Sequence, residues 1–336
     1  MATKSRIETL DAFRGLAALS VVLFHFTAKY RETFNGHTYS SKYDFVYGYL
    51  GVQFFFILSG FVIFMTVQYC KTGHEFLYKR FSRLYPVFWA CLLIIIVSYA
   101  AAQLAGIPQK PIEPKRVLLN FTMIPKFLGS RPLDGAYWSL QVEFFFYISI
   151  FLLLVTRQMK NILYWGLLLL VFSWIHYCVY PFPLRVQQVL NTNYSCLFLA
   201  GILFYKFRTD VQERKKWQNH LFVAFCFLTA CITCNLYSER MIIGVFFVLF
   251  YLFSFDKLNK INWKPLLFLG SISYPLYLVH QHIGYTLMQL TRHHLAKYPP
   301  LFIGFPLAVA IVTATLLHKF VELPSAKWLK QFKFKN

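Results

Sequence analysis

Long apolar stretches recur along the whole chain, and short polar segments separate them. An α-helix needs roughly 17 to 25 mostly apolar residues to cross the hydrocarbon core of a bilayer. By this length criterion the pattern predicts about ten membrane-spanning helices. They cover residues 10–28, 48–69, 84–106, 137–156, 161–180, 193–207, 220–236, 238–254, 265–289 and 300–321. The chain is therefore predicted to be an all-α, polytopic membrane protein.

The composition agrees with a membrane location. Of the 336 residues, 57% are hydrophobic and only 14% are charged, which lies outside the range of soluble globular domains. The first apolar segment has no small-residue cleavage site behind it, so we expect it to stay as a helix and not to be removed as a signal peptide. One membrane domain is expected over residues 1–336, with its core at 6–325 and a basic cytoplasmic tail at 326–336.

The basic residues indicate the orientation of the helices. If both termini are cytoplasmic, the inner segments hold 21 Lys and Arg and the outer segments hold 12, five of them in the long 107–136 connection. Because Lys and Arg favour cytoplasmic loops and long loops count less, both termini are predicted to be inside. The net charge of +21 is spread over short loops, so we expect contact with anionic lipid and no nucleic-acid partner.

Two ionisable side chains lie in the first apolar segment, DAFRGLAALSVVLFHF. Arg14 and His25 are eleven residues apart, which in an α-helix places them on one face, roughly 16 Å apart along the axis. With the N-terminus inside, Arg14 lies near the cytoplasmic boundary and His25 in the outer half of the bilayer. Taken singly, such residues are often a lipid anchor and a bond between helices, but the shared face favours a functional role.

Two more ionisable residues, Glu143 and His280, are expected near the depth of His25, and Tyr277 lies three residues before His280. Glu143 ends the motif WSLQVE, and Tyr277 and His280 lie in SYPLYLVH. An imidazole supported by a carboxylate can draw a proton from a hydroxyl group. We therefore predict His25 as a catalytic base supported by Glu143, with Tyr277 and His280 binding an acceptor or stabilising an oxyanion. A structural hydrogen bond between helices is the alternative for the His–Glu pair, and structural hydrogen bonding is the alternative for Tyr277 and His280.

Arg80 and Arg83 come just before the third predicted span and are one helical turn apart. Alone they would serve as a cytoplasmic anchor. Together with Arg14 they offer bidentate donors that suit phosphate oxygens. No metal site is expected, because the one CxxC motif, Cys231 and Cys234, has no second pair and no nearby ligand histidines. The odd number of cysteines, seven, implies no disulfide framework.

Five of these motifs together resemble the acyltransferase-3 family of membrane acyltransferases. They are Arg14 with His25, FFFILSGF, Arg80-x-x-Arg83, WSLQVE and SYPLYLVH, in this order and over about residues 6 to 325. The resemblance implies a ten-helix protein of the cell membrane, expected to be a bacterial inner membrane. It also implies transfer of an acyl group, usually acetyl from cytoplasmic acetyl-CoA, to a sugar hydroxyl of a surface or extracellular glycan. Arg14, His25, Arg80 and Arg83 match the residues regarded as functional in that family.

The resemblance and the residue pattern suggest one mechanism. Arg14, Arg80 and Arg83 would bind the phosphates of the donor at the cytoplasmic side, and the pantetheine arm would reach between the helices toward His25. His25 would then act as a base or carry the acyl group transiently.

Some relatives in this family add an extracytoplasmic SGNH hydrolase-like domain, and the given chain ends soon after its last predicted span. We therefore expect that the membrane domain performs the whole reaction or that a separate extracytoplasmic acyl-transfer protein completes it. Two other functions fit intramembrane charges: a proton-coupled transporter, and a non-catalytic glycan assembly subunit of the same fold. The acceptor glycan, the acyl chain and the oligomeric state stay open.

Overall fold

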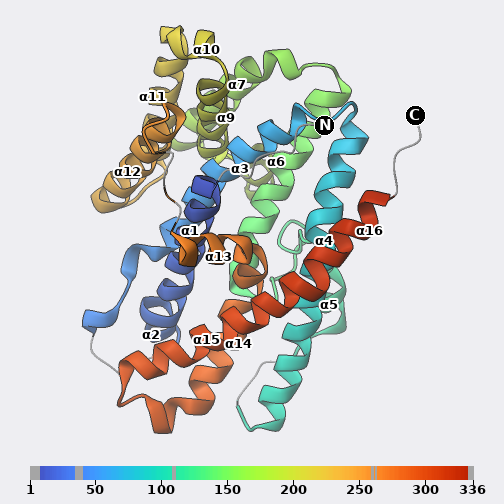
Figure 1. Cartoon of the computed structure of the whole chain (residues 1–336), viewed down its shortest axis with the longest axis vertical. Coiled ribbons are helices and arrows are strands. Elements are labelled where there is room, and N and C mark those ends of the chain that lie inside the picture. The colour runs from blue at the N-terminus through green and yellow to red at the C-terminus, as the bar shows by residue number, and fades with distance from the viewer. Residues whose placement is uncertain (1–7, 35–40, 108–110, 259–260, 262, 332–336) are drawn as a thin grey trace. The chain divides into compact units, whose positions relative to one another are not determined.

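The computed structural model describes residues 8–34, 41–107, 111–258, 261 and 263–331. Within these residues the chain is helical and contains no β-strand, which confirms the all-α prediction (Figure 1). Among the described residues, seven helical segments are long and apolar enough to cross a membrane. They are Glu8–Thr33, Ser41–Val67, Gly73–Leu104, Gly135–Val155, Met159–Cys178, Tyr237–Ser254 and Pro299–Trp328. A count of ten spans and cytoplasmic termini stay predictions, and residues 1–7 and 332–336 of the predicted core and tail lie outside the described residues.

The chain folds into two compact units, each assembled from separate stretches of sequence. The first unit comprises Met1–Leu10, Val52–Tyr78 and Gln141–Asn262. The second unit comprises Asp11–Gly51, Lys79–Leu140 and Trp263–Asn336. A single membrane domain over residues 1–336 stays a prediction.

Helix α9 lies at the centre of the first unit. It runs from Ser195 to Thr209, and its residues from Ser195 to Phe204 are all buried. The helices packed around it are α7 (Ile162–Cys178), α10 (Val211–Lys215), α11 (Trp217–Ile232) and α12 (Tyr237–Ser254). The unit also contains α3 (Gly51–Val67, from Val52 on), α6 (Trp138–Val155, from Gln141 on) and α8 (Leu184–Leu190). A helix that is apolar on every side, such as α9, is stable where other helices surround it.

Two glycines allow α3 and α9 to cross in direct backbone contact. A Cβ atom added to Gly60 would lie 2.0 Å from the carbonyl oxygen of Phe198. A Cβ atom added to Gly201 would lie 2.1 Å from the carbonyl oxygen of Ile57. Small residues at such a crossing bring helices close enough for extensive van der Waals contact. Gly60 of the FFFILSGF motif therefore has a packing role.

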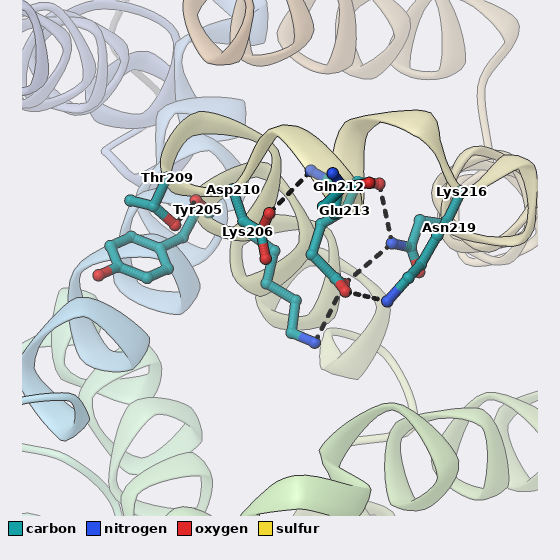
Figure 2. Close-up of polar contacts among 8 residues, drawn as sticks. All are labelled: Tyr205, Lys206, Thr209, Asp210, Gln212, Glu213, Lys216 and Asn219. Carbon is teal, nitrogen blue, oxygen red and sulfur yellow. Dashed lines mark hydrogen bonds and ion pairs between the residues drawn. The ribbon is translucent and has the colours of Figure 1, made fainter.

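A cluster of polar side chains fixes the turn from α9 through α10 to α11 (Figure 2). The Glu213 carboxylate accepts hydrogen bonds from Lys206, Lys216 and Asn219. Burial acts to raise the pKa of Glu213, but these three partners outweigh burial and lower the pKa below its ordinary value. The carboxylate is therefore charged at neutral pH and holds three elements of the first unit together.

Paired helices form much of the second unit. Helices α14 (Ser273–Leu295) and α15 (Pro299–Leu317) pack along each other, and α15 runs on through a π-turn (His318–Glu322) into α16 (Leu323–Gln331) as one rod (Figure 1). The unit also contains most of α1 (Glu8–Phe24) and α4 (Gly73–Leu104), together with α2 (Tyr30–Thr33) and α5 (Pro114–Asn120). Helix α4 begins before the predicted span 84–106, so Arg80 and Arg83 lie on the helix itself.

The predicted span 265–289 differs from the structure because it is interrupted. Helix α13 (Lys264–Ser271) ends just before α14 begins at Ser273. The short α13 approaches α1 so closely that a Cβ atom on Gly270 would lie 1.9 Å from the Asp11 carbonyl oxygen. A Cβ atom on Gly15 would lie 2.3 Å from the carbonyl oxygen of Leu266. The break at Ile272 lets α13 lie against α1 while α14 follows a different direction.

Candidate functional site

His25 lies where the first helix changes from α-helical to π-helical geometry. Helix α1 ends at Phe24, and a π-turn runs from His25 to Lys29. Single π-turns inside helices are rare and frequently occur at functional sites. An uninterrupted α-helix runs from Arg14 to Phe24, the residue directly before His25. The structure is therefore compatible with the prediction that Arg14 and His25 share one face of the helix.

A second imidazole contacts His25. Nδ1 of His25 lies 2.9 Å from the carbonyl oxygen of Val21 and 3.2 Å from Nε2 of His280, and the two ring centroids are 4.9 Å apart. Nδ1 of His280 lies 2.9 Å from the Tyr277 carbonyl oxygen and 3.2 Å from that of Leu276. His280 is fully buried, whereas His25 is partly exposed. The two elements that supply this pair, α14 and the π-turn after α1, pack against each other in the second unit.

These contacts assign the tautomers of both rings. Carbonyl oxygens only accept hydrogen bonds, so Nδ1 of each histidine carries the proton. The proton on His25 Nδ1 can then be shared between the Val21 carbonyl and the unprotonated Nε2 of His280. Nε2 of His25 is left with a lone pair on a partly exposed ring. A neutral imidazole held in this way can accept a proton from a hydroxyl group.

Tyr277 holds α14 against the segment that leads into α6. Its hydroxyl donates to the carbonyl oxygen of Ala136 at 2.8 Å and lies 2.6 Å from Oγ of Ser139. The Tyr137 hydroxyl donates to the Leu278 carbonyl oxygen in the same region. Roles of Tyr277 and His280 in acceptor binding stay predictions.

The second unit brings the three predicted donor-binding arginines near one another. Arg80 and Arg83 are close enough for their charges to repel the charge of Arg14. Arg14 donates a hydrogen bond to Oδ1 of Asp11, one turn earlier on α1, at 3.2 Å. Arg80 is only 8% exposed. A polyanion beside these guanidinium groups would be stabilised by charge-assisted hydrogen bonds, and a donor site at the three arginines stays a prediction.

Glu143 lies in the first unit, where it accepts a hydrogen bond from the Ser59 hydroxyl at 2.7 Å. This contact joins α6 to α3 and brings the motifs WSLQVE and FFFILSGF together. The support of His25 by Glu143 stays a prediction, because His25 belongs to the second unit.

One histidine–carboxylate pair in the structure was not predicted from the sequence. Nδ1 of His318 lies 2.7 Å from Oε2 of Glu322, at opposite ends of the π-turn that follows α15. The spacing of four residues in HKFVE, at the end of the predicted span 300–321, is the signal that could have found it. Among the described residues, no group of three or more His, Cys, Asp and Glu side chains is placed to hold a metal ion.

Comparison with known proteins places the whole chain in one group. Residues 7–318 match the model of a family described as an acyltransferase domain. The chain is 25% identical to the peptidoglycan O-acetyltransferase OatA of Listeria monocytogenes over 401 residues, which include 99% of this chain and 59% of the relative. It is 23% identical to a putative O-acetyltransferase of Staphylococcus aureus strain COL over 366 residues, 96% of this chain and 57% of the relative.

A third relative, protein 2 in the picA locus of Rhizobium radiobacter, is 34% identical over 122 residues, which cover 34% of this chain and 56% of the relative. No solved structure matches the chain. The chain spans less than three fifths of the length of these relatives. Because the family match extends over nearly all of its residues, the chain belongs to this family of acyltransferase domains.

Proposed function

We propose that this chain is a multi-pass membrane O-acetyltransferase that moves an acetyl group from acetyl-CoA to a sugar hydroxyl of a cell-surface glycan. The observation that carries the proposal is the free Nε2 lone pair of His25 on the same helix as the arginine that begins the donor site. Family membership and the names of the two O-acetyltransferase relatives support it. The predicted orientation places the arginines at the cytoplasmic side and His25 in the outer half of the membrane.

The donor would be held by its phosphates. Arg14, Arg80 and Arg83 present planar guanidinium groups that pair with phosphate oxygens in bidentate geometry. Binding of the phosphates would relieve the repulsion among the three positive charges. This arrangement favours a nucleotide thioester over a neutral acyl donor.

The transfer itself needs one base and one leaving group. Nε2 of His25 takes the proton of the acceptor hydroxyl as the oxygen attacks the thioester carbonyl carbon. A carbon–oxygen bond forms, the carbon–sulfur bond breaks, and the leaving thiolate takes up the proton from the His25 imidazolium to give free CoA. The reaction is balanced with no further reactant.

Glu143 is proposed as the carboxylate that stabilises the imidazolium form of His25, and Tyr277 and His280 as groups near the acceptor or the oxyanion. A separate extracytoplasmic protein could receive the acyl group in the same scheme, and the proposal includes this route.

The full chain reconstituted in lipid nanodiscs tests the function. With acetyl-CoA and a panel of chito- and cello-oligosaccharides, we expect free thiol to be released only when an acceptor is present, with formation of an acetyl ester detected by mass spectrometry. The His25→Gln variant should release thiol at least about a hundredfold more slowly. Movement of protons or solute in liposomes without consumption of acetyl-CoA would support the transporter instead. Full surface acetylation in cells that carry His25→Gln would support the non-catalytic assembly subunit.

A further inference from the structure

The second unit contains a cavity of about 210 Å³ that the proposed transfer mechanism does not use. Its wall comes from four places: Phe34 at the end of α2, the end of α4, the segment before α6, and one face of α14. The residues that matter for its chemistry are Tyr99, Asp134, Gly135, Gln281, His282 and Tyr285. Residues 281 and 285 are one helical turn apart on α14, so this face is a continuous stripe.

Asp134 places a carboxylate in the wall, although its side chain is almost completely buried. Only 2% of the residue is exposed. Its Oδ1 accepts a hydrogen bond from the backbone N–H of Ala136 at 2.8 Å, and its Oδ2 accepts one from the N–H of His282 at 3.0 Å. A carboxyl group has more hydrogen-bonding positions than these two contacts fill, whether it is ionised or protonated, so it can also bond a ligand in the cavity.

The segment that carries Asp134 is held rigidly. The fully buried Asn120 accepts a hydrogen bond from the N–H of Leu133 at 2.8 Å and donates one to the Arg131 carbonyl at 3.1 Å. Arg116 donates to the Pro132 carbonyl at 2.6 Å. A wall fixed by its own hydrogen bonds loses little conformational entropy when a ligand binds.

Helix α14 brings buried polar atoms without a hydrogen-bond partner to this wall. Oε1 of Gln281 and Nε2 of His282 are buried and make no hydrogen bond within the described part of the chain. Buried polar atoms in native proteins nearly always have a partner, because leaving one unpaired costs free energy. The His282 ring is stacked on Tyr99 with centroids 4.0 Å apart, so its direction is fixed. We therefore expect a hydrogen-bonding occupant.

The lack of a side chain at Gly135 leaves room for the side chain of Gln281. A Cβ atom on Gly135 would lie 2.7 Å from Nε2 of Gln281, too close for an ordinary contact. Any side chain at position 135 would therefore push the Gln281 amide away from its place in the wall.

The lining selects one class of ligand. It combines amide, carboxyl, imidazole and phenol groups with no lysine or arginine, so it does not suit phosphates. Each sugar hydroxyl both donates and accepts hydrogen bonds, which matches a wall that presents acceptors and donors together. One water needs only ~10–15 Å³ of such space, so the cavity has room for a ligand of several non-hydrogen atoms, as in a sugar ring with its hydroxyls.

The Tyr285 side chain contributes to the cavity wall and lies near the proposed base, His25. Tyr285 lines it, and the centroid of the Tyr285 ring lies 6.5 Å from that of His25. We propose that this cavity binds a sugar ring of the acceptor and thereby presents a hydroxyl of the same or the adjoining ring to His25. The inference rests on the proposed function and names the residues that recognise the acceptor.

The test compares Gln281→Leu with a matched control, Gln103→Leu. Gln103 is an exposed glutamine at the end of α4, outside the cavity wall. With acetyl-CoA and an oligosaccharide that the wild type acetylates, Gln281→Leu should raise the acceptor KM about tenfold, the loss expected for one hydrogen bond, with a much smaller change in kcat. Gln103→Leu should match the wild type. Gly135→Ala, which displaces the same amide, should also raise the acceptor KM, and an unchanged unfolding temperature shows that each variant is folded.

A binding measurement without donor separates this inference from the proposed function. Saturation-transfer NMR on the nanodisc-embedded wild type with chitotetraose should show contact to the sugar ring protons, and Gln281→Leu should weaken it. If the wild type transfers acetyl while both cavity variants keep the wild-type acceptor KM, the cavity is not the acceptor site. If the wild type transfers nothing, the proposed function fails, and loss of the chitotetraose signal in Gln281→Leu would still support a sugar site. Equal NMR signals from wild type and Gln281→Leu would overturn the inference.

Discussion

Nε2 of His280 lies 3.2 Å from Nδ1 of His25, so a buried imidazole is the side chain that orients the proposed base. A neutral imidazole can accept the Nδ1 proton and hold the ring, but it does not stabilise the positive charge that His25 acquires as it accepts a proton. Orientation and charge stabilisation are therefore separate tasks here. His280 is suited to the first task, and the second is the one predicted for Glu143.

Replacing the two histidines should have effects of different size. We expect His25→Gln to lower kcat by 10²- to 10⁴-fold, the usual contribution of a positioned base. His280→Leu removes one of the two partners of His25 Nδ1 and leaves the Val21 carbonyl, so it should lower kcat about tenfold. His280→Gln, which can still accept the Nδ1 proton, should recover part of that loss. Rates over a range of pH check this, and equal rates for the Leu and Gln variants would show that His280 only fills space.

The arginines should act on the donor and not on the acceptor. We expect Arg83→Ala to raise the KM for acetyl-CoA at least about tenfold, because a charge-assisted hydrogen bond to phosphate is lost. The preference for acetyl-CoA over acetyl-pantetheine, which lacks the nucleotide phosphates, should fall by the same factor. Arg185→Ala, at an exposed arginine of α8, is the control. An unchanged preference in Arg83→Ala would remove Arg83 from the donor site.

Asp134 should make stability depend on pH. Burial raises the pKa of Asp134 to about 7, against the opposing effect of two backbone hydrogen bonds. The folded state therefore binds the proton more tightly than the unfolded state, whose pKa is about 3.9. The stabilising contribution is complete below about pH 4 and is lost as the pH rises to about 7, by roughly 4 kcal/mol at 1.36 kcal/mol per pKa unit.

The Asp134→Asn variant removes this titration. We expect the apparent unfolding temperature of the wild type in nanodiscs to fall between pH 5 and pH 8, and that of Asp134→Asn to change much less. Parallel curves for the two proteins would contradict the assignment.

The crossing of α3 and α9 should tolerate no side chain at its glycines. Gly60→Ala places a methyl group against the Phe198 carbonyl oxygen, and overpacking of this kind costs about 1–3 kcal/mol. Gly244→Ala is the matched control in the same unit, because its Cβ atom would meet only the Phe227 ring at 3.6 Å. There the better helix propensity of alanine should leave stability unchanged or raise it by up to about 1 kcal/mol. Unfolding temperatures check both, and equal values would exclude a tight crossing.

The helices could be predicted from the sequence because a membrane span is a local signal. Length and apolar composition suffice, and each of the ten predicted segments falls on helix in the structure. The interruption at Ile272 could not be predicted in the same way, because it depends on the approach of α13 to Gly15 of a helix far away in the chain. The two π-turns were also missed, since one additional residue in a helical turn leaves the apolar composition unchanged.

The candidate site was predicted in part. Helical periodicity placed Arg14 and His25 on one face, and the same argument placed Arg80 one turn from Arg83. Depth in the membrane put His280 at the level of His25, but depth does not reveal which side chains touch. The contact between the two imidazoles depends on how α14 packs against the π-turn. Asp134 was missed because it precedes a predicted span and has the composition of a loop.

The unbroken helix between Arg14 and Phe24 fixes the distance between its two ends. Backbone hydrogen bonds fix the rise of each residue, so the separation between the proposed donor-binding end and the proposed base cannot adapt to the substrate. A donor must therefore be long enough to extend from the arginines to His25. A donor with a shorter arm between its phosphates and its acyl group would bind well and react slowly. The backbone of this helix would thus select donors by the length of the arm that carries the acyl group. This selectivity would not depend on the side chains between the arginines and His25.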